Sequence, residues 1–209
     1  DSDLLIEAAS ADFSLTRQSG APFRLGLRQL RVAMPDRVWP KTDIALSLWR
    51  GDAGISLDLY AEHLVLQELR TLVDVRLPEH EARDALKGLA PSGTIRDLRL
   101  QIDTRDSPPT WRAAAKLEDL SAARWQDVPA MEGISGALIA NSGLARLTLD
   151  SRDSRVTFDQ LFRQPLPLDR IRGDLALSYD ADSWSVRSER LVVVPGGPQR
   201  CRVGRRADR

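Results

Sequence analysis

Gly133–Leu138 reads GISGAL, Gly143–Arg152 reads GLARLTLDSR, and Leu161–Leu177 reads LFRQPLPLDRIRGDLAL. These segments combine glycines with residues that alternate between apolar and polar types, and two prolines interrupt the last segment. Because successive side chains of a β-strand point to opposite faces of the sheet, the alternation predicts strands with one apolar face. No cluster of reactive side chains accompanies these strands. The chemistry that they offer is therefore that of an apolar surface.

The same alternation recurs along the chain with unusual regularity. The sets that place three apolar side chains on one face are Phe23/Leu25/Leu27, Ile44/Leu46/Leu48, Ile55/Leu57/Leu59, Leu98/Leu100/Ile102, Ala145/Leu147/Leu149 and Leu175/Leu177/Tyr179. Shorter pieces follow the same pattern at Phe13/Leu15, Val156/Phe158, Trp184/Val186 and Leu191/Val193. The pattern predicts a mainly β fold with about a dozen antiparallel strands.

The alternation is interrupted from about residue 64 to residue 89. There the apolar residues take helical spacing, at Leu66, Leu69, Leu72 and Val73 and later at Ala82, Ala85, Leu86 and Leu89. Pro78 suits the first turn of a helix and Gly88 suits its C-terminal cap. We therefore predict a short helical insert of two helices that covers an edge or an end of the sheet.

A weak internal repeat indicates how the strands are arranged. Gly93-Thr-Ile, Gly136-Ala-Leu and Gly173-Asp-Leu lie about 40 residues apart, and each follows a proline-bearing loop. We expect each glycine to open a strand and the strands to build an elongated, twisted, repeating antiparallel sheet with a groove-like apolar face. Residues 1–194 form this β-rich segment. The chain opens on strand-like residues without a leader pattern, which is typical of an internal fragment.

The last residues have a different composition. From residue 195 to residue 209 the apolar periodicity stops, and arginine and glycine dominate. This composition is typical of a disordered or non-native tail, and the alternative is a basic arm that contacts anionic lipid headgroups. The single cysteine, Cys201, lies in this tail, so an internal disulfide bond and a cysteine-based metal site are excluded.

Composition narrows the function classes. Thirty basic and thirty acidic residues balance, so nothing in the bulk charge points to nucleic acid as a partner. The two histidines, His63 and His80, are not spaced from carboxylates as a metal site or a nucleophile requires. The carboxylate pairs Asp103/Asp106 and Asp150/Asp153 are expected at strand-to-loop transitions, where aspartate favours turns. We expect no catalytic site, no metal site and no cofactor.

Six weak motifs, taken in their order and spacing, resemble a known family. They are LAPSGTIRDL at Leu89–Leu98, AKLEDLSAARW at Ala115–Trp125, GISGAL at Gly133–Leu138, LDSR at Leu149–Arg152, LFRQPLPL at Leu161–Leu168 and GDLAL at Gly173–Leu177. Over residues 1–194 the chain resembles the central region of YhdP-type proteins of the AsmA-like group.

The resemblance implies a function. Members of this family are long envelope proteins of Gram-negative bacteria, tethered to the inner membrane by an N-terminal helix. Their β-rich periplasmic part shields phospholipid acyl chains in an apolar groove and supports phospholipid transport to the outer membrane and the envelope permeability barrier. By this resemblance the partners are phospholipid, neighbouring segments of the same full-length protein, and the two membranes through regions outside this chain.

The apolar sets have two interpretations. They line a lipid groove, or they form the closed core of a β-sandwich that binds a protein partner without lipid. As a lining surface the residues are Leu25, Leu27, Ile44, Leu46, Leu48, Ile55, Leu57, Leu59, Leu98, Leu100, Ile102, Leu147, Leu149, Leu175 and Leu177. A third interpretation is a carbohydrate-binding module that uses some of the five tryptophans, Trp39, Trp49, Trp111, Trp125 and Trp184, although their scatter favours ordinary packing.

Three arginines flank the proline-bearing connector. Arg163, Arg170 and Arg172 are candidates for holding lipid phosphates, because guanidinium groups bind phosphate in a bidentate manner. The alternative is that Asp169 and Asp174 neutralise them locally.

Overall fold

The computed structural model describes residues 6–35, 37–67, 84, 87–126, 128–157, 164–179 and 184–196. Twelve strands in this part of the chain form a single sheet. Their bounds are β1 Ala8–Thr16, β2 Phe23–Met34, β3 Arg37–Val38, β4 Thr42–Gly51, β5 Gly54–Val65, β6 Ser92–Asp103, β7 Thr110–Ala122, β8 Ala130–Asn141, β9 Leu144–Thr157, β10 Leu166–Tyr179, β11 Trp184–Arg187 and β12 Leu191–Pro195.

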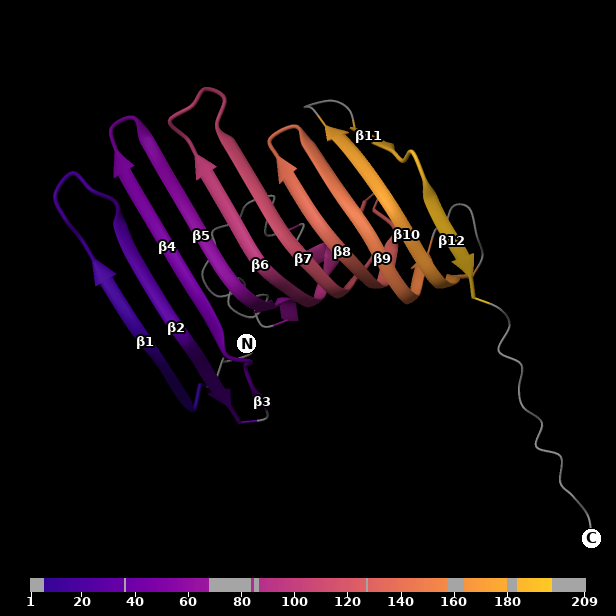
Figure 1. Cartoon of the computed structure of the whole chain (residues 1–209), viewed down its shortest axis with the longest axis horizontal. Coiled ribbons are helices and arrows are strands. Elements are labelled where there is room, and N and C mark those ends of the chain that lie inside the picture. Colours follow the sequence, from indigo (N-terminus) through magenta and orange to yellow (C-terminus); the bar gives the residue numbers. More distant parts are fainter. Residues whose placement is uncertain are drawn as a thin grey trace, which may run out of the picture.

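The sheet is an antiparallel meander in which neighbours in sequence are neighbours in space (Figure 1). The order across the sheet is β1-β2-β4-β5-β6-β7-β8-β9-β10-β11, with β3 paired to β2 and β12 paired to β10. Both β11 and β12 lie along the side of β10 that faces away from β9. The prediction of a mainly antiparallel β fold is therefore confirmed.

Helical structure is confined to short pieces in the described residues. Residues 66–67, 84 and 87–89 are helical. The strand β5 continues to Val65, because Leu64 and Val65 still pair with β6, and helical residues begin at Leu66, close to the expected start of the insert at about residue 64. Most of the predicted insert lies outside the described residues. No helix in the described part is long and apolar enough to cross a membrane.

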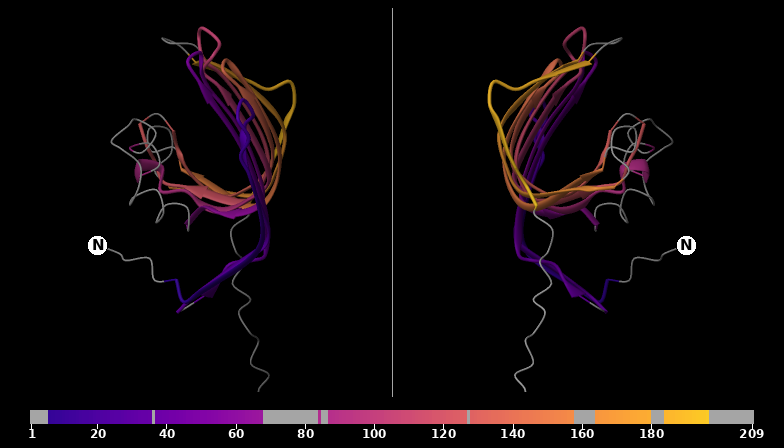
Figure 2. Two further views of the ribbon diagram at one scale, coloured as in Figure 1. Left: turned by 90° about the vertical axis from the view of Figure 1, so that its left-hand side faces the viewer. Right: turned by 90° about the vertical axis from the view of Figure 1, so that its right-hand side faces the viewer.

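Bulges interrupt the ladder in several of the long strands. Four of them centre on a non-glycine residue in the left-handed backbone region, where φ is 51–52°: Gln29, Asp97, Asp119 and Asp153. Register shifts fall beside them in the pairs β2–β4, β6–β7, β7–β8 and β8–β9. A bulge bends its strand and increases the local twist. Together these bulges curl the sheet, which is seen in cross-section in Figure 2.

The two faces of the curled sheet differ in burial. The buried strand residues lie on the face that carries the leucine sets, and a cluster of Ile134, Leu149, Leu168 and Ile171 packs there against partly buried neighbours. Side chains crowd together on the inner side of a curved single layer and spread apart on the outer side. The leucine face is therefore the concave face, and the opposite face is the convex face.

Hydroxyl groups replace ladder hydrogen bonds on the concave face. Ser151 is fully buried, and its Oγ accepts a hydrogen bond from Ser135 N at 2.8 Å and donates one to Ser135 O at 3.0 Å. Thr42 Oγ1 makes the same double contact with the backbone of His63, at 3.0 and 2.9 Å. A buried backbone N–H or C=O group that lacks a hydrogen-bond partner reduces the stability of the fold. These hydroxyls supply that partner where the backbone hydrogen bonds between the two strands are interrupted.

Two of the three repeat glycines occupy positions that the sequence did not predict. Gly93 lies at the start of β6, but Gly136 and Gly173 lie inside β8 and β10 rather than at their beginnings. A Cβ at Gly136 would collide with Thr148 O, and one at Gly173 would collide with Arg190 O. These glycines therefore permit a close approach of neighbouring backbones in the middle of long strands.

Candidate functional site

The concave face carries rows of apolar side chains that cross the sheet from edge to edge. Residues that are directly opposite in an antiparallel pair point to the same face, so the pairing register identifies the members of each row. The central row consists of Leu15, Leu25, Leu46, Leu59, Leu100, Ala113, Ala140, Ala145, Leu177 and Val186, each paired with the next. This row joins residues from ten strands.

Flanking rows widen the apolar face on both sides of the central row. One flanking row contains Phe23, Leu48, Leu57, Ile102 and Trp111. On the other side lie Leu27 with Ile44 and Ala61, and Leu138 with Leu147 and Leu175. The fifteen leucine and isoleucine residues predicted as a lining all fall on this one face.

The lining residues are half-buried rather than enclosed. Of the fifteen, only Leu149 is buried, at 4% exposure, and Ile55 at the start of β5 is exposed. The other thirteen have intermediate exposure. A closed sandwich would bury this row under a second sheet, and all the described strands belong to one sheet. The apolar face is therefore an open surface among the described residues.

The convex face is polar and carries the ion pairs. Arg96 pairs with Glu118 at 3.4 Å, Lys116 with Asp97 at 2.8 Å, and Arg155 with Glu132 at 2.9 Å. Thr148 Oγ1 contacts Asp174 at 2.6 Å, and Gln101 donates to Asp58 at 2.8 Å. The Lys116 hydrogen bond lowers the pKa of Asp97. Exposed pairs of this kind contribute little stability, about 0–1 kcal/mol each, but they keep this face in water.

A family model described as YhdP protein matches residues 2–195 of this chain. The chain belongs to the YhdP family. It is 25% identical over 164 residues to the intermembrane phospholipid transporter YhdP of Escherichia coli strain K12. That match covers 74% of this chain and 13% of the relative, so the chain spans a small part of the relative's length. No solved structure matches the chain.

Two of the three candidate headgroup arginines of this YhdP-family chain lie on the convex face. Arg170 donates to Asp150 Oδ1 at 3.1 Å, so the partner is a carboxylate other than the expected Asp169. Arg172 is exposed and alternates with Ile171 and Gly173, which face the concave side. Arg163 lies outside the described residues. Headgroup contact by these arginines stays a prediction.

The carboxylate pairs and His63 take part in local structure. Arg105 donates from its side chain and its backbone to Asp103, and these hydrogen bonds lower the pKa of Asp103 to about 2. Asp106 accepts from Thr110 at 2.8 Å. His63 lies in β5, where its backbone contacts Thr42.

The second carboxylate pair does not lie at a strand end as expected. Asp150 and Asp153 are both inside β9, because the bulge at Asp153 lets the strand continue to Thr157. In the described part of the chain, no three His, Cys, Asp or Glu side chains gather as metal ligands would. His80 lies outside that part.

The tryptophans that the structure places do not share a plane. Trp111 pairs with Ile102 on the concave face, whereas Trp49 alternates with Leu48 and lies on the convex face, where the Arg105 guanidinium stacks 5.2 Å from its ring centre. Trp125 lies in an isolated bridge with Val128. Sugar rings stack on aromatic side chains that share a surface, so this arrangement does not favour a carbohydrate platform.

Sequence reasoning missed the residues that curl the sheet. At three of the four bulges two apolar residues are three positions apart, and Asp or Gln directly precedes the second one: Leu27/Leu30, Ile95/Leu98 and Leu117/Leu120. A strict alternation would place these two residues on opposite faces. The extra residue returns both to the concave face, and this spacing is the signal that locates the bulges.

Proposed function

We propose that the concave face of this segment carries the acyl chains of phospholipid, as part of a longer YhdP-family protein that moves phospholipid across the periplasm toward the outer membrane. One observation supports this proposal most strongly, namely the unbroken apolar row that crosses ten strands, in which every residue except Ala140 is at least partly exposed to solvent. Family membership and the name of the Escherichia coli relative, an intermembrane phospholipid transporter, support the same substrate.

The length of the central row suits a lipid chain. Nine strand spacings of about 4.8 Å give a row of about 43 Å. A bilayer core of about 30 Å holds two acyl chains end to end, so one chain is about 15 Å long. The face is therefore longer than a single acyl chain, and a lipid has more than one position to occupy along it.

The energetic benefit follows from partial burial. Burial of one methylene is worth about 0.8 kcal/mol, so a sixteen-carbon chain in water costs about 12 kcal/mol. A chain lying on an open face loses contact with water on one side, which removes about half of that cost. The headgroup stays in water, and neighbouring positions are chemically alike, so the lipid slides without a deep minimum.

The transport needs no chemical step. Moving a lipid along a uniform surface breaks no bond and transfers no proton, so the residues of the concave face act as a lining and not as catalysts. We accordingly propose a function other than catalysis, without a cofactor. The working location is the periplasm, with a tether in the inner membrane and neighbouring segments of the same protein supplied by regions outside this chain.

The rival functions require geometries that differ from the one observed. A sandwich module that binds a partner without lipid would need the leucine rows to meet a second sheet, and the described strands form one sheet. A carbohydrate module would need coplanar exposed tryptophans. The open apolar face is the feature that favours lipid over both alternatives.

Site-specific photo-crosslinking tests the proposal. A photoreactive residue is introduced at Leu100, Leu147 or Leu177 on the concave face, and the control carries it at the adjacent residue, Gln101 or Arg146, on the convex face. Each variant is incubated with vesicles of Escherichia coli phospholipid, irradiated and analysed by mass spectrometry. We expect lipid adducts at the concave positions only. Equal yields at adjacent positions would refute a lipid-carrying face.

A further inference from the structure

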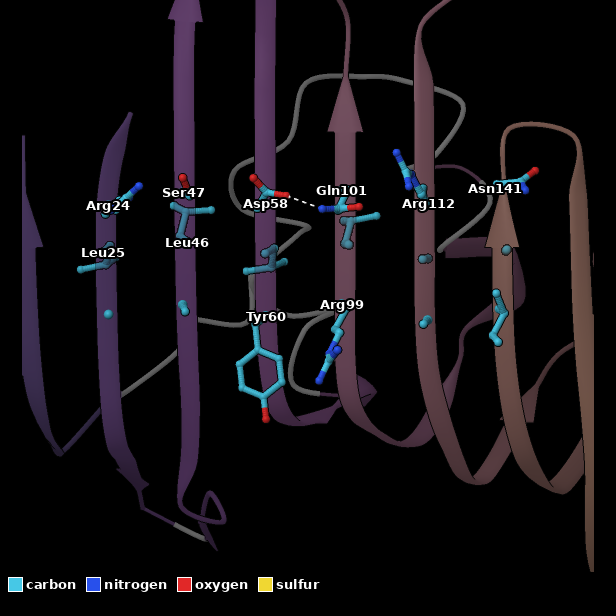
Figure 3. A pocket seen from close by; sticks show the side chains of 18 of the residues that line it. Arg24, Leu25, Leu46, Ser47, Asp58, Tyr60, Arg99, Gln101, Arg112 and Asn141 are labelled. Atoms are coloured by element: carbon cyan, nitrogen blue, oxygen red, sulfur yellow. Dashed lines mark hydrogen bonds between the residues drawn. The ribbon is translucent and has the colours of Figure 1, made fainter. Parts of the chain in front are cut away.

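The convex face has its own hollow, which the leucine rows do not use. The hollow has a volume of 740 Å³ and extends across the sheet from β2 to β8 (Figure 3). Its lining comprises three consecutive rows, and two of them have their side chains on the convex face. These two rows contain Arg24, Ser47, Asp58, Gln101, Arg112 and Asn141, and then Gly26, Ala45, Tyr60, Arg99, Ala114 and Ile139. The third row is the central leucine row, which contributes its backbone to the floor.

Small residues create the depression. Gly26, Ala45 and Ala114 have little or no side chain to cover the backbone floor. The side chains of Arg24 and Arg112 extend toward one end of the strands, and those of Tyr60 and Arg99 extend toward the other end (Figure 3). A second, smaller cavity of 100 Å³ shares Asp58, Gln101 and Arg112 with the hollow and extends it along β6 and β7.

The hollow has a net positive charge, because three arginines and one carboxylate line it. Arg24, Arg99 and Arg112 are exposed, and within the described residues none of the three forms an ion pair, whereas Arg96, Arg155 and Arg170 on the same face do. The single carboxylate in the lining is Asp58, and Gln101 already donates to it at 2.8 Å. Unpaired guanidinium groups beside a hollow favour a ligand with carboxylates.

The hollow carries some of the residue types that contribute most to binding at protein interfaces. Its lining contains three arginines and a tyrosine, which are enriched among interface hot spots, next to small residues. Ile139 presents 66% of its surface to solvent at one end of the hollow. A partner therefore meets both charge and exposed apolar surface.

The spacing of the arginines defines the complementary sequence. Arg24 and Arg112 lie in one row, four strands apart, which corresponds to about 19 Å. An extended peptide rises about 3.3 Å per residue, so two carboxylates that meet these arginines are about six residues apart. Asp58 lies halfway between them and disfavours a third acidic residue at the centre.

We propose that this convex hollow binds an extended acidic segment of a partner protein. The segment lies across the strands, its two acidic side chains meet Arg24 and Arg112, and a neutral or basic residue passes Asp58. This site is on the opposite face from the proposed lipid surface and does not depend on it.

Fluorescence anisotropy with a labelled peptide tests the proposal. The probe is a serine-rich peptide with two glutamates about six residues apart, and its control has glutamine at both positions. We expect the complete chain to bind the glutamate peptide, and Arg24→Gln and Arg112→Gln each to weaken binding about 10-fold, because each substitution removes a charge-assisted hydrogen bond to a carboxylate. Arg31→Gln, at an exposed arginine of β2 outside the hollow, is the matched control and leaves the affinity unchanged.

Several outcomes would overturn the proposal. The first is equal binding of the glutamate and glutamine peptides, and the second is an equal effect of Arg31→Gln. A third is binding of vesicles that contain phosphatidylglycerol through Arg24 and Arg112 while the peptide fails to bind, because the occupant would then be a lipid surface. Circular dichroism confirms that the glutamine variants keep their β structure. Lipid crosslinking at Leu100 is unaffected in every case, so failure here is distinguishable from failure of the lipid proposal.

Discussion

The curl of the sheet depends on hydroxyls that satisfy its interrupted ladder, and Ser151→Ala tests that dependence. In the structure Ser151 is fully buried and its Oγ serves both the N–H and the C=O of Ser135. Alanine keeps the β-carbon and removes both hydrogen bonds. The perturbation therefore isolates the hydroxyl from packing.

The magnitude follows from the two groups that lose a partner. An unsatisfied buried donor or acceptor costs about 1–3 kcal/mol. Ser135 itself is only half-buried, so water reaches part of the vacated site and each loss falls toward the low end. We expect Ser151→Ala to reduce the free energy of unfolding by about 2–4 kcal/mol. With a urea m-value of about 2–3 kcal/mol/M, the midpoint falls by about 1 M.

Urea unfolding followed by circular dichroism measures this shift. The control is Ser178→Ala, which removes an exposed hydroxyl that contacts Ser185 Oγ at 2.8 Å. An exposed hydroxyl exchanges its partner for water, so the control moves the unfolding free energy by less than about 0.5 kcal/mol. If both variants unfold at the same urea concentration, the buried hydroxyl does not support the interrupted ladder and the reasoning is refuted.

Two further predictions concern the hairpin tip and the strand glycines. Hydrogen bonds from Arg105 hold the pKa of Asp103 at about 2, so the contact between the two side chains is complete above pH 3.8 and is lost as the pH falls through about 2. We expect Arg105→Gln to return the midpoint of the Asp103 titration, measured by NMR, toward 3.8. An unchanged midpoint would exclude Arg105 as the cause of the lowered pKa. Gly173→Ala places a Cβ against Arg190 O at a φ of 153° and lowers the free energy of unfolding by more than about 1 kcal/mol, measured in urea. Gly20→Ala is the comparison, since no atom lies within 4 Å of its added Cβ, and an equal loss there would show that backbone strain alone accounts for the effect.

The sequence was sufficient to predict the apolar face because period-two alternation is a direct consequence of strand geometry. The sets around Leu46, Leu59 and Leu100 pair in register as one row. Alternation predicts that these residues share a face, whereas the register between the strands is set by the turns that join them. Family membership over residues 2–195 agrees with the resemblance seen in the motifs.

The sequence was insufficient where two strands must be considered together. Gly136 looked like the start of a strand because strands often follow glycine, but its role is set by the carbonyl of Thr148 on the neighbouring strand. The role of Ser151 likewise depends on another strand, because its hydroxyl accepts a hydrogen bond from the N–H of Ser135, sixteen residues away in the chain. The residue pattern of a single strand does not show which backbone groups of the neighbouring strand will approach it or need a hydrogen-bond partner.

The two faces of the sheet differ in how much their side chains contribute to folding stability and in what they expose to solvent. On the convex face the ion pairs are exposed and contribute little to folding stability. The arginines on this face can therefore serve solubility or partner binding without a large effect on the stability of the fold. On the concave face the leucines near the bulges are crowded into a core, whereas those in the central row remain half-exposed. The same curvature that buries Leu149 and Ile171 thus keeps the central row open. A flat sheet would expose the whole apolar face, and a closed sandwich would bury all of it. Four bulges and two buried hydroxyl contacts set an intermediate degree of curl. This curl leaves part of the apolar face exposed to solvent while the residues near the bulges still pack into a core.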